Sequence, residues 1–128
     1  MSYHFSKTTR LSFDDAITRV TEALKKEGFG VLTEIDVKET LKRKLDVDFR
    51  KYRILGACNP AFAYRALQAE DKIGTMLPCN VIVQDLGDGR VEVAAIDPAG
   101  SMERIGKPDL TDLASTVRSK LQAVLARL

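Results

Sequence analysis

Hydrophobic and polar residues alternate along the chain with two different periods, and these periods predict a series of strands and helices. The clearest helix carries one apolar stripe whose members are three or four residues apart: Phe13, Ile17, Val20 and Leu24. Ser12 stands where a side-chain cap is needed, and Gly28 can end the helix with a positive φ. The pattern therefore predicts a helix over residues 12–28.

The rest of the chain continues this alternation. Asn59-Pro60 predicts a helix start, because Asn caps well and Pro at the first helical position gives up no needed hydrogen bond. Asp36 and Asp109 are the predicted caps of two further helices. The predicted strands cover residues 3–8, 29–35, 52–57, 79–86 and 90–97, and the predicted helices cover residues 12–28, 36–45, 59–70 and 109–128. Residues 71–77 are predicted to form a loop.

The order β-α-β-α-β-α-β-β-α predicts an α+β fold in one domain, residues 1–128. We expect a two-layer α/β sandwich with a mixed sheet of about five strands and with helices packed mainly on one face. The last two strands are predicted to form a hairpin, since Asp88-Gly89 supplies the two positive-φ residues of a type I′ turn. Counting outward from that turn places Asn80 opposite Asp97, unless a bulge shifts the register.

Composition narrows the class of protein. Apolar residues make up 45% of the chain and charged residues 30%, as in ordinary globular domains. The net charge of +2 indicates no polyanionic partner, and the basic residues within 38–53 are interpreted as a solvated helix face, because no nucleic-acid motif accompanies them. No apolar run has the length of a membrane span, and the first ten residues lack the apolar block of a signal peptide. We therefore expect a cytoplasmic protein without nucleic-acid or membrane partners.

The two cysteines are the most informative residues. Cys58 and Cys79 are each followed by asparagine, and each stands where a strand is predicted to begin or end. Cys58 also precedes a helix N-terminus, which stabilises a thiolate, so it can act as a nucleophile with Cys79 as its partner. The alternative is that both thiols pack in the core as small apolar groups. Antiparallel pairing of their strands would bring the thiols together, whereas a parallel arrangement would separate them.

Metal binding needs more ligands than these two. His4 is the only histidine, so a closed zinc site would require Asp97 or a second copy of the chain to complete the set. Two thiolates alone can hold cuprous copper. The ligand count nevertheless favours a protein without a metal, and we expect no cofactor.

Several motifs resemble a known family of domains of unknown function, DUF302. The similar stretches are VLTEIDV at 31–37, YRILGACNP at 52–60, PCNV at 78–81 and AIDP at 95–98. The resemblance implies a compact α/β domain that forms a homodimer, and it implies no particular activity. The residues that match the family pattern are Glu34, Asp36, Cys58, Asn59, Pro60, Cys79, Asn80 and Asp97.

Our leading hypothesis is a cytoplasmic homodimeric domain that binds a small molecule in a polar pocket. The predicted ligand-binding residues are Cys58, Asn59, Cys79, Asn80 and Asp97, with Met76 and Leu77 as an apolar wall. One alternative is a thiol-based redox enzyme or sensor that uses Cys58 and Cys79. Another is a structural or interaction module whose cysteines lie in the core.

Overall fold

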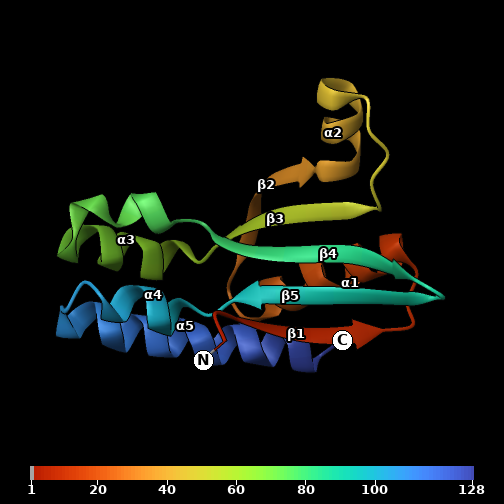
Figure 1. Cartoon of the computed structure of the whole chain (residues 1–128). Helices are drawn as coiled ribbons and strands as arrows, with labels where there is room; N and C mark the ends of the chain where they lie inside the picture. The colour runs from red at the N-terminus through yellow and green to blue at the C-terminus, as the bar shows by residue number, and fades with distance from the viewer. Residues whose placement is uncertain (1) are drawn as a thin grey trace.

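The computed structural model describes residues 2–128, and its strands and helices follow the predicted order with two additions (Figure 1). The additions are a 3-10 helix, η1, and a short helix, α4. The strands are β1 (His4–Thr9), β2 (Gly30–Asp36), β3 (Tyr52–Cys58), β4 (Cys79–Gly87) and β5 (Arg90–Ile96). The helices are α1 (Phe13–Lys26), α2 (Val37–Leu45), α3 (Pro60–Ala69), η1 (Asp71–Met76), α4 (Pro98–Glu103) and α5 (Pro108–Ala126).

All five strands form one sheet in the order β1-β5-β4-β3-β2. Each neighbouring pair is antiparallel, so the two-layer α/β fold with five strands is confirmed, but the sheet is not mixed as predicted. A parallel neighbour requires a helix that crosses back over the sheet. Here α2 and α3 stand at opposite ends of the sheet, so each following strand runs back beside the previous one (Figure 1). The crossing helix is α1, which joins the two edge strands, β1 and β2.

One face of the sheet is covered by α1 and α5. The predicted stripe of α1 is buried at Phe13, Val20 and Leu24. The predicted cap is confirmed, because the Ser12 hydroxyl accepts a hydrogen bond from the Asp15 N–H at 3.1 Å. The strand residues that complete this first cluster point toward the two helices: Leu55, Ala57, Val81, Val83, Val91, Val93 and Ala95. Burial of these side chains supplies the main apolar contribution to stability.

α5 extends beyond the sheet, and its first half belongs to a second hydrophobic cluster (Figure 1). This cluster joins α5 to α3, η1 and α4 through Ala66, Ile73, Met102, Leu110, Leu113 and Ala114. Phe62 of α3 packs against both clusters. The molecule therefore has two apolar clusters that share one long helix and meet near Phe62.

The β4–β5 turn has the predicted conformation but not the predicted register. Asp88 and Gly89 both have positive φ. One strand, however, contains a β-bulge between Asp85 and Gly87, so that Leu86 is an extra residue. The Gly87 N–H donates to the Asp85 carboxylate at 2.9 Å, which supports the bulged backbone.

The bulge overturns one specific prediction. Val81 pairs with Ala95, so Asn80 is not opposite Asp97 as counting from the turn had placed it. A single inserted residue shifts every later pair by one position, and a hydrophobic pattern of period two does not reveal it in a short strand.

Three local predictions also change. The segment between α3 and β4, predicted to be a loop, forms η1. The chain after β5 continues as α4, because the Asp97 carboxylate accepts a hydrogen bond from the Ala99 N–H at 3.1 Å and caps that helix. α5 begins at Pro108 rather than after a cap at Asp109, since Pro at the first helical position has no N–H to satisfy.

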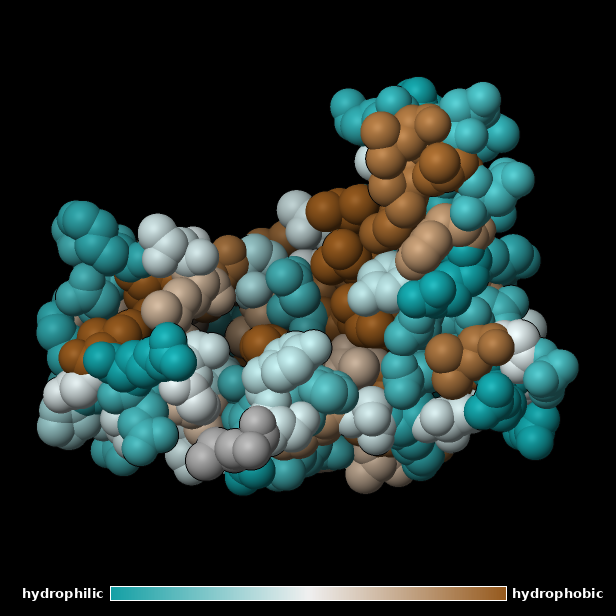
Figure 2. Space-filling view, viewed as in Figure 1, coloured by the Kyte–Doolittle hydropathy of each residue, from teal (hydrophilic) through white to brown (hydrophobic). Residues whose placement is uncertain are grey.

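The other face of the sheet is open, because among residues 2–128 no helix lies across it (Figure 1). Four residues in register form an apolar row across this face: Ile35, Ile54, Ile82 and Ala94. α2 stands beside the row and has no buried residue. Leu45 is 66% exposed and Val47 is 42% exposed. Figure 2 shows apolar surface that continues from the sheet onto α2, beside a hollow in the molecule.

Gly56 on β3 is required by close packing, and this generates a test. A Cβ at this position would lie 2.2 Å from Thr33 Oγ1 and 2.8 Å from Pro78 Cγ. The threonine hydroxyl can rotate away, but the proline ring cannot, so we expect Gly56→Ala to lower the free energy of unfolding by roughly 1–3 kcal/mol. Gly30→Ala on β2 is the matched control, because a Cβ there meets no atom within 4 Å. Equal urea midpoints for the two variants would contradict the packing argument.

Candidate functional site

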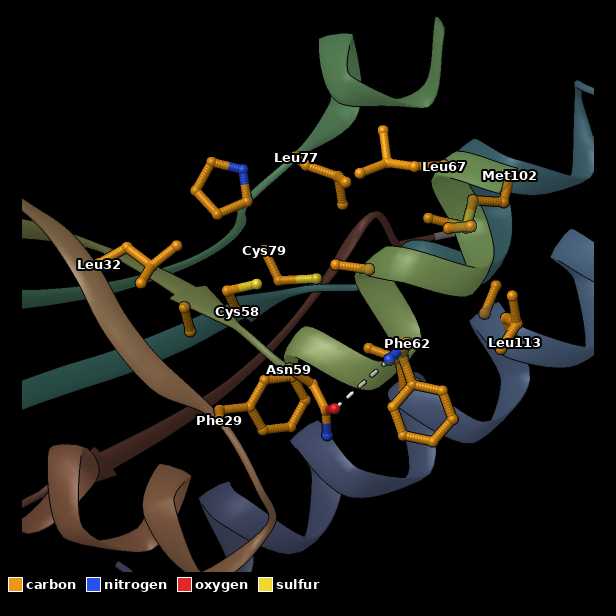
Figure 3. A pocket seen from close by; sticks show the side chains of 16 residues that line it. Phe29, Leu32, Cys58, Asn59, Phe62, Leu67, Leu77, Cys79, Met102 and Leu113 are labelled. Atoms are coloured by element: carbon orange, nitrogen blue, oxygen red, sulfur yellow. Dashed lines mark hydrogen bonds between the residues drawn. The ribbon is translucent and has the colours of Figure 1, made fainter. Parts of the chain in front are cut away.

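A cavity of about 300 Å³ lies where β3 and β4 meet α3, at the junction of the two hydrophobic clusters (Figure 3). Its lining residues come from strands and helices that are far apart in the sequence: Phe29, Leu32, Ala57, Cys58, Asn59, Phe62, Ala63, Ala66, Leu67, Leu77, Pro78, Cys79, Met102, Leu113, Ala114 and Val117. Asn59 is the one polar amide among them, and no charged side chain lines the cavity. The cavity is therefore apolar, whereas the prediction was a polar pocket.

The pairing of β3 with β4 brings the two cysteines to this cavity. The strands are antiparallel, and Ala57 is the register partner of Cys79, so Cys58 is one residue away from that pair. Of the two arrangements that the sequence left open, the structure has the antiparallel one. Both thiols are partly buried, and Figure 3 shows the two sulfur atoms in the same wall of the cavity.

Cys79 is held in its neutral form. Burial raises the pKa of the Cys79 thiol to about 11, and the neighbouring Cys58 adds a smaller contribution in the same direction. An apolar surrounding disfavours the charged form of any acid, which explains the direction. At neutral pH, Cys79 is accordingly a thiol rather than a nucleophilic thiolate.

Asn59 has a structural role at the start of α3. Its Oδ1 accepts the Phe62 N–H at 3.5 Å, as an N-cap does, and its Nδ2 donates to the Glu27 carbonyl at 3.5 Å. The amide therefore ties α3 to the end of α1. A Cβ at Gly28 would lie 3.0 Å from Asn59 Nδ2, so the glycine leaves room for this contact. Both polar groups of the side chain already have partners within the protein.

Asn80 and Asp97 are not part of this cavity. Asn80 pairs with Gly56 and is exposed on the open face, because successive residues of a strand point to opposite faces. Asp97 caps α4, and its Oδ2 pairs with Arg118 Nε at 3.2 Å. The structure thus brings Cys58, Asn59 and Cys79 together and places the other two predicted residues elsewhere.

The predicted apolar wall is also divided. Leu77 lines the cavity, whereas Met76 is 44% exposed and lines a separate hollow with Asn80. Most of the remaining lining was not predicted as a site. The small side chains Ala63 and Ala66 leave space on the inner face of α3, and this three-residue spacing is the one sequence signal that could have indicated a gap.

Two residues that match the family pattern, Glu34 and Asp36, belong to a charged cluster away from the cavity. Both carboxylates of β2 contact the Arg53 guanidinium of β3. Burial alone lowers the pKa of Arg53, but the hydrogen bond and charge of Glu34, followed by those of Asp36, outweigh it and raise the pKa. Asp36 also accepts the Glu39 N–H at 3.0 Å and so caps α2. This cluster fixes the position from which α2 rises.

Neither a metal cluster nor a membrane helix is found in the described part of the chain. Within residues 2–128, no three His, Cys, Asp or Glu side chains come together in an arrangement that could hold a metal ion. No helix in the same range combines the length and the apolar character needed to cross a bilayer.

The raised pKa of Cys79 generates a pH prediction. In the folded protein, we expect iodoacetamide to leave Cys79 unmodified near neutral pH and to react about tenfold faster with each further pH unit, because only the thiolate reacts. Mass spectrometry of the alkylated peptides measures this, with urea-unfolded protein as the control. The folded state holds the proton more tightly than the unfolded chain, so stability falls as pH rises from 9.0 toward about 11. Rapid alkylation of Cys79 at neutral pH would contradict the assignment.

Comparison with known proteins gives a family but no activity. The model for the "Domain of unknown function DUF302" matches residues 5–128. The crystal structure of an uncharacterized conserved DUF302 protein from Bacillus stearothermophilus is similar, with a TM-score of 0.91 and 31% sequence identity. The similarity covers 99% of this chain and 98% of that one. No curated protein matches the chain. The motifs, the fold and the family match agree, and the chain belongs to the DUF302 family.

Proposed function

We propose that this domain binds a small apolar molecule in the cavity beside Cys58 and Cys79. The observation that carries this proposal is the cavity itself. It is a partly open space of about 300 Å³ between the two hydrophobic clusters, and its lining is almost entirely apolar. This volume is at the lower end of the range for small-molecule sites, which begins at about 300 Å³.

The chemistry of the lining defines the class of ligand. Asn59 uses both of its polar groups within the protein, and Cys79 carries its proton at neutral pH. A polar or charged ligand would therefore lose its hydration without gaining partners, which costs several kcal/mol by general estimates of about 2–7 kcal/mol per group. For a short aliphatic chain or a small ring, transfer from water into the cavity is favourable. Such ligands fit this site best.

An apolar entrance supports the same assignment. Leu32 is 68% exposed and Leu67 is 43% exposed, yet both line the cavity. Leu32 is the extra residue of a bulge between Val31 and Thr33 in β2, and Leu67 lies on α3. Their exposure places apolar side chains at the boundary between the cavity and solvent. A ligand can therefore enter without crossing a charged rim.

A substitution that fills the cavity tests the proposal. We expect Ala66→Leu to weaken binding of N-phenyl-1-naphthylamine, a neutral apolar fluorophore, by roughly tenfold, or about 1.4 kcal/mol, because the added carbons occupy ligand space. Ala61→Leu is the matched control, since Ala61 is exposed on the same helix and does not line the cavity. Fluorescence titration measures both variants. Equal affinity of the two variants, or no binding by the unmodified protein, would contradict the proposal.

We also propose that the open face of the sheet associates with a second copy of the chain, in line with the homodimer that the family resemblance implied. The row Ile35, Ile54, Ile82 and Ala94 forms an apolar floor, and α2 forms an apolar wall beside it. A nine-residue helix has little stability by itself in water, so contacts to its apolar side would stabilise it. The apolar side of α2 in each copy can cover the apolar row on the sheet of the other copy, with the two copies related by a twofold axis.

The size of the surface agrees with this occupant. Five strands about 4.8 Å apart and about seven residues long present roughly 500 Å² of sheet. The exposed surface of α2 adds to this area and brings the total toward the roughly 800 Å² that each partner contributes to a standard interface. A peptide or a small partner would leave most of this area uncovered.

Charges placed on this surface test the association. We expect sedimentation equilibrium to give a dimer for the unmodified protein and a monomer for the double variant Ile35→Asp, Leu45→Asp, because both carboxylates would be buried without partners. Tyr64→Asp is the control, since Tyr64 is a 65% exposed apolar residue on α3, away from this face. A monomeric unmodified protein, or a double variant that remains dimeric, would contradict the dimer.

A further inference from the structure

Cys58 and Cys79 lie near each other at one end of the sheet, and both line the cavity. Directly opposed residues of antiparallel strands have Cα atoms about 4.5–5.5 Å apart, and Cys58 is one position along from the partner of Cys79. The Cα atoms of the two cysteines are therefore separated by roughly 6 Å, inside the range of about 4.4–6.8 Å found in disulfides. Figure 3 shows the two side chains directed into the same space.

The two thiols have different surroundings. Cys79 begins β4 and packs against the sheet cluster. Cys58 stands at the end of β3, one residue before the cap of α3. Apart from the two thiols, the residues that line the cavity include no acidic, basic or histidine side chain. The chemistry available to the pair is therefore that of the two sulfur atoms.

From this placement, we propose that Cys58 and Cys79 form an oxidisable dithiol that closes to a disulfide inside the cavity when it meets a hydroperoxide. Its effect on ligand binding rests on the function proposed above, whereas formation of the disulfide does not. Apolar hydroperoxides are the fitting oxidants, because they can enter the same cavity as an apolar ligand.

The reaction balances with one hydroperoxide per pair. The Cys58 thiolate attacks the terminal oxygen, the O–O bond breaks, and the remaining alkoxide leaves as an alcohol after taking a proton from solvent. Cys58 is then a sulfenic acid. The Cys79 sulfur attacks the Cys58 sulfur, the S–O bond breaks, and the hydroxyl leaves as water with the Cys79 proton. The two sulfurs lose two electrons in total, and the hydroperoxide gains them.

Disulfide formation would change the wall of the cavity. The chain between the two cysteines contains α3 and η1 and supplies five lining residues besides the polar cap and Pro78: Phe62, Ala63, Ala66, Leu67 and Leu77. A bond between its two ends would hold this segment as a closed loop. It would also replace two thiols with a rigid bridge at the centre of the lining. The oxidised cavity should therefore bind an apolar ligand with a different affinity.

Mass spectrometry of the full chain tests the dithiol. We expect one equivalent of cumene hydroperoxide to remove two hydrogen atoms from the monomer and to give one cross-linked peptide that contains Cys58 and Cys79. Cys79→Ser should stop at the sulfenic acid, which dimedone traps, and Cys58→Ser should react slowest. An unchanged mass, a disulfide between two chains, or fastest oxidation of the variant that lacks Cys58 would overturn the proposal.

Titration with N-phenyl-1-naphthylamine separates this proposal from the binding function. We expect the affinity of the reduced and oxidised proteins to differ by at least threefold, and dithiothreitol to restore the reduced value. If the reduced protein binds no probe while the disulfide still forms, the binding function fails and the dithiol stands. If both forms bind the probe equally, the proposed effect of the disulfide on the cavity is wrong.

Discussion

The structure depends on the double role of α5, which contributes residues to both hydrophobic clusters where they meet near Phe62. Its second half, with Leu121 and Val124, closes the sheet against α1. Its first half, with Leu110 and Leu113, holds α3, η1 and α4. One helix can support both clusters but cannot fill the space between them. The cavity occupies this space, so it follows from the architecture rather than from a local packing defect.

The features that the sequence predicted well are those decided by neighbouring residues. The caps at Ser12, Asp36 and Asn59 each accept a backbone N–H as expected, because a cap needs only a short polar side chain at one position. The Asp88-Gly89 turn has the expected positive φ values for the same reason. Strand direction and the bulge at Leu86 involve pairing between distant segments, and the hydrophobic pattern carries little information about either.

Prediction of the candidate site from the sequence has the same limit. Asn59, predicted both as a helix cap and as a pocket residue, caps α3 and lines the cavity, whereas Asp97 caps α4 and lies outside it. The lining of the cavity is instead apolar and comes from segments that only the folded chain brings together. Cys58 and Cys79 do lie together at the cavity. Their strands are antiparallel, which is one of the two arrangements that the sequence left open.

The bulge at Leu32 has a consequence for how the sheet ends. β2 is an edge strand, and an edge with a regular row of free N–H and C=O groups invites further strands from other molecules. The extra residue interrupts the regular backbone of β2 between Val31 and Thr33 and increases its twist. A strand from another molecule therefore cannot pair regularly along the whole of β2. The residue that exposes an apolar side chain beside the cavity therefore also makes this edge a poorer template for a further strand.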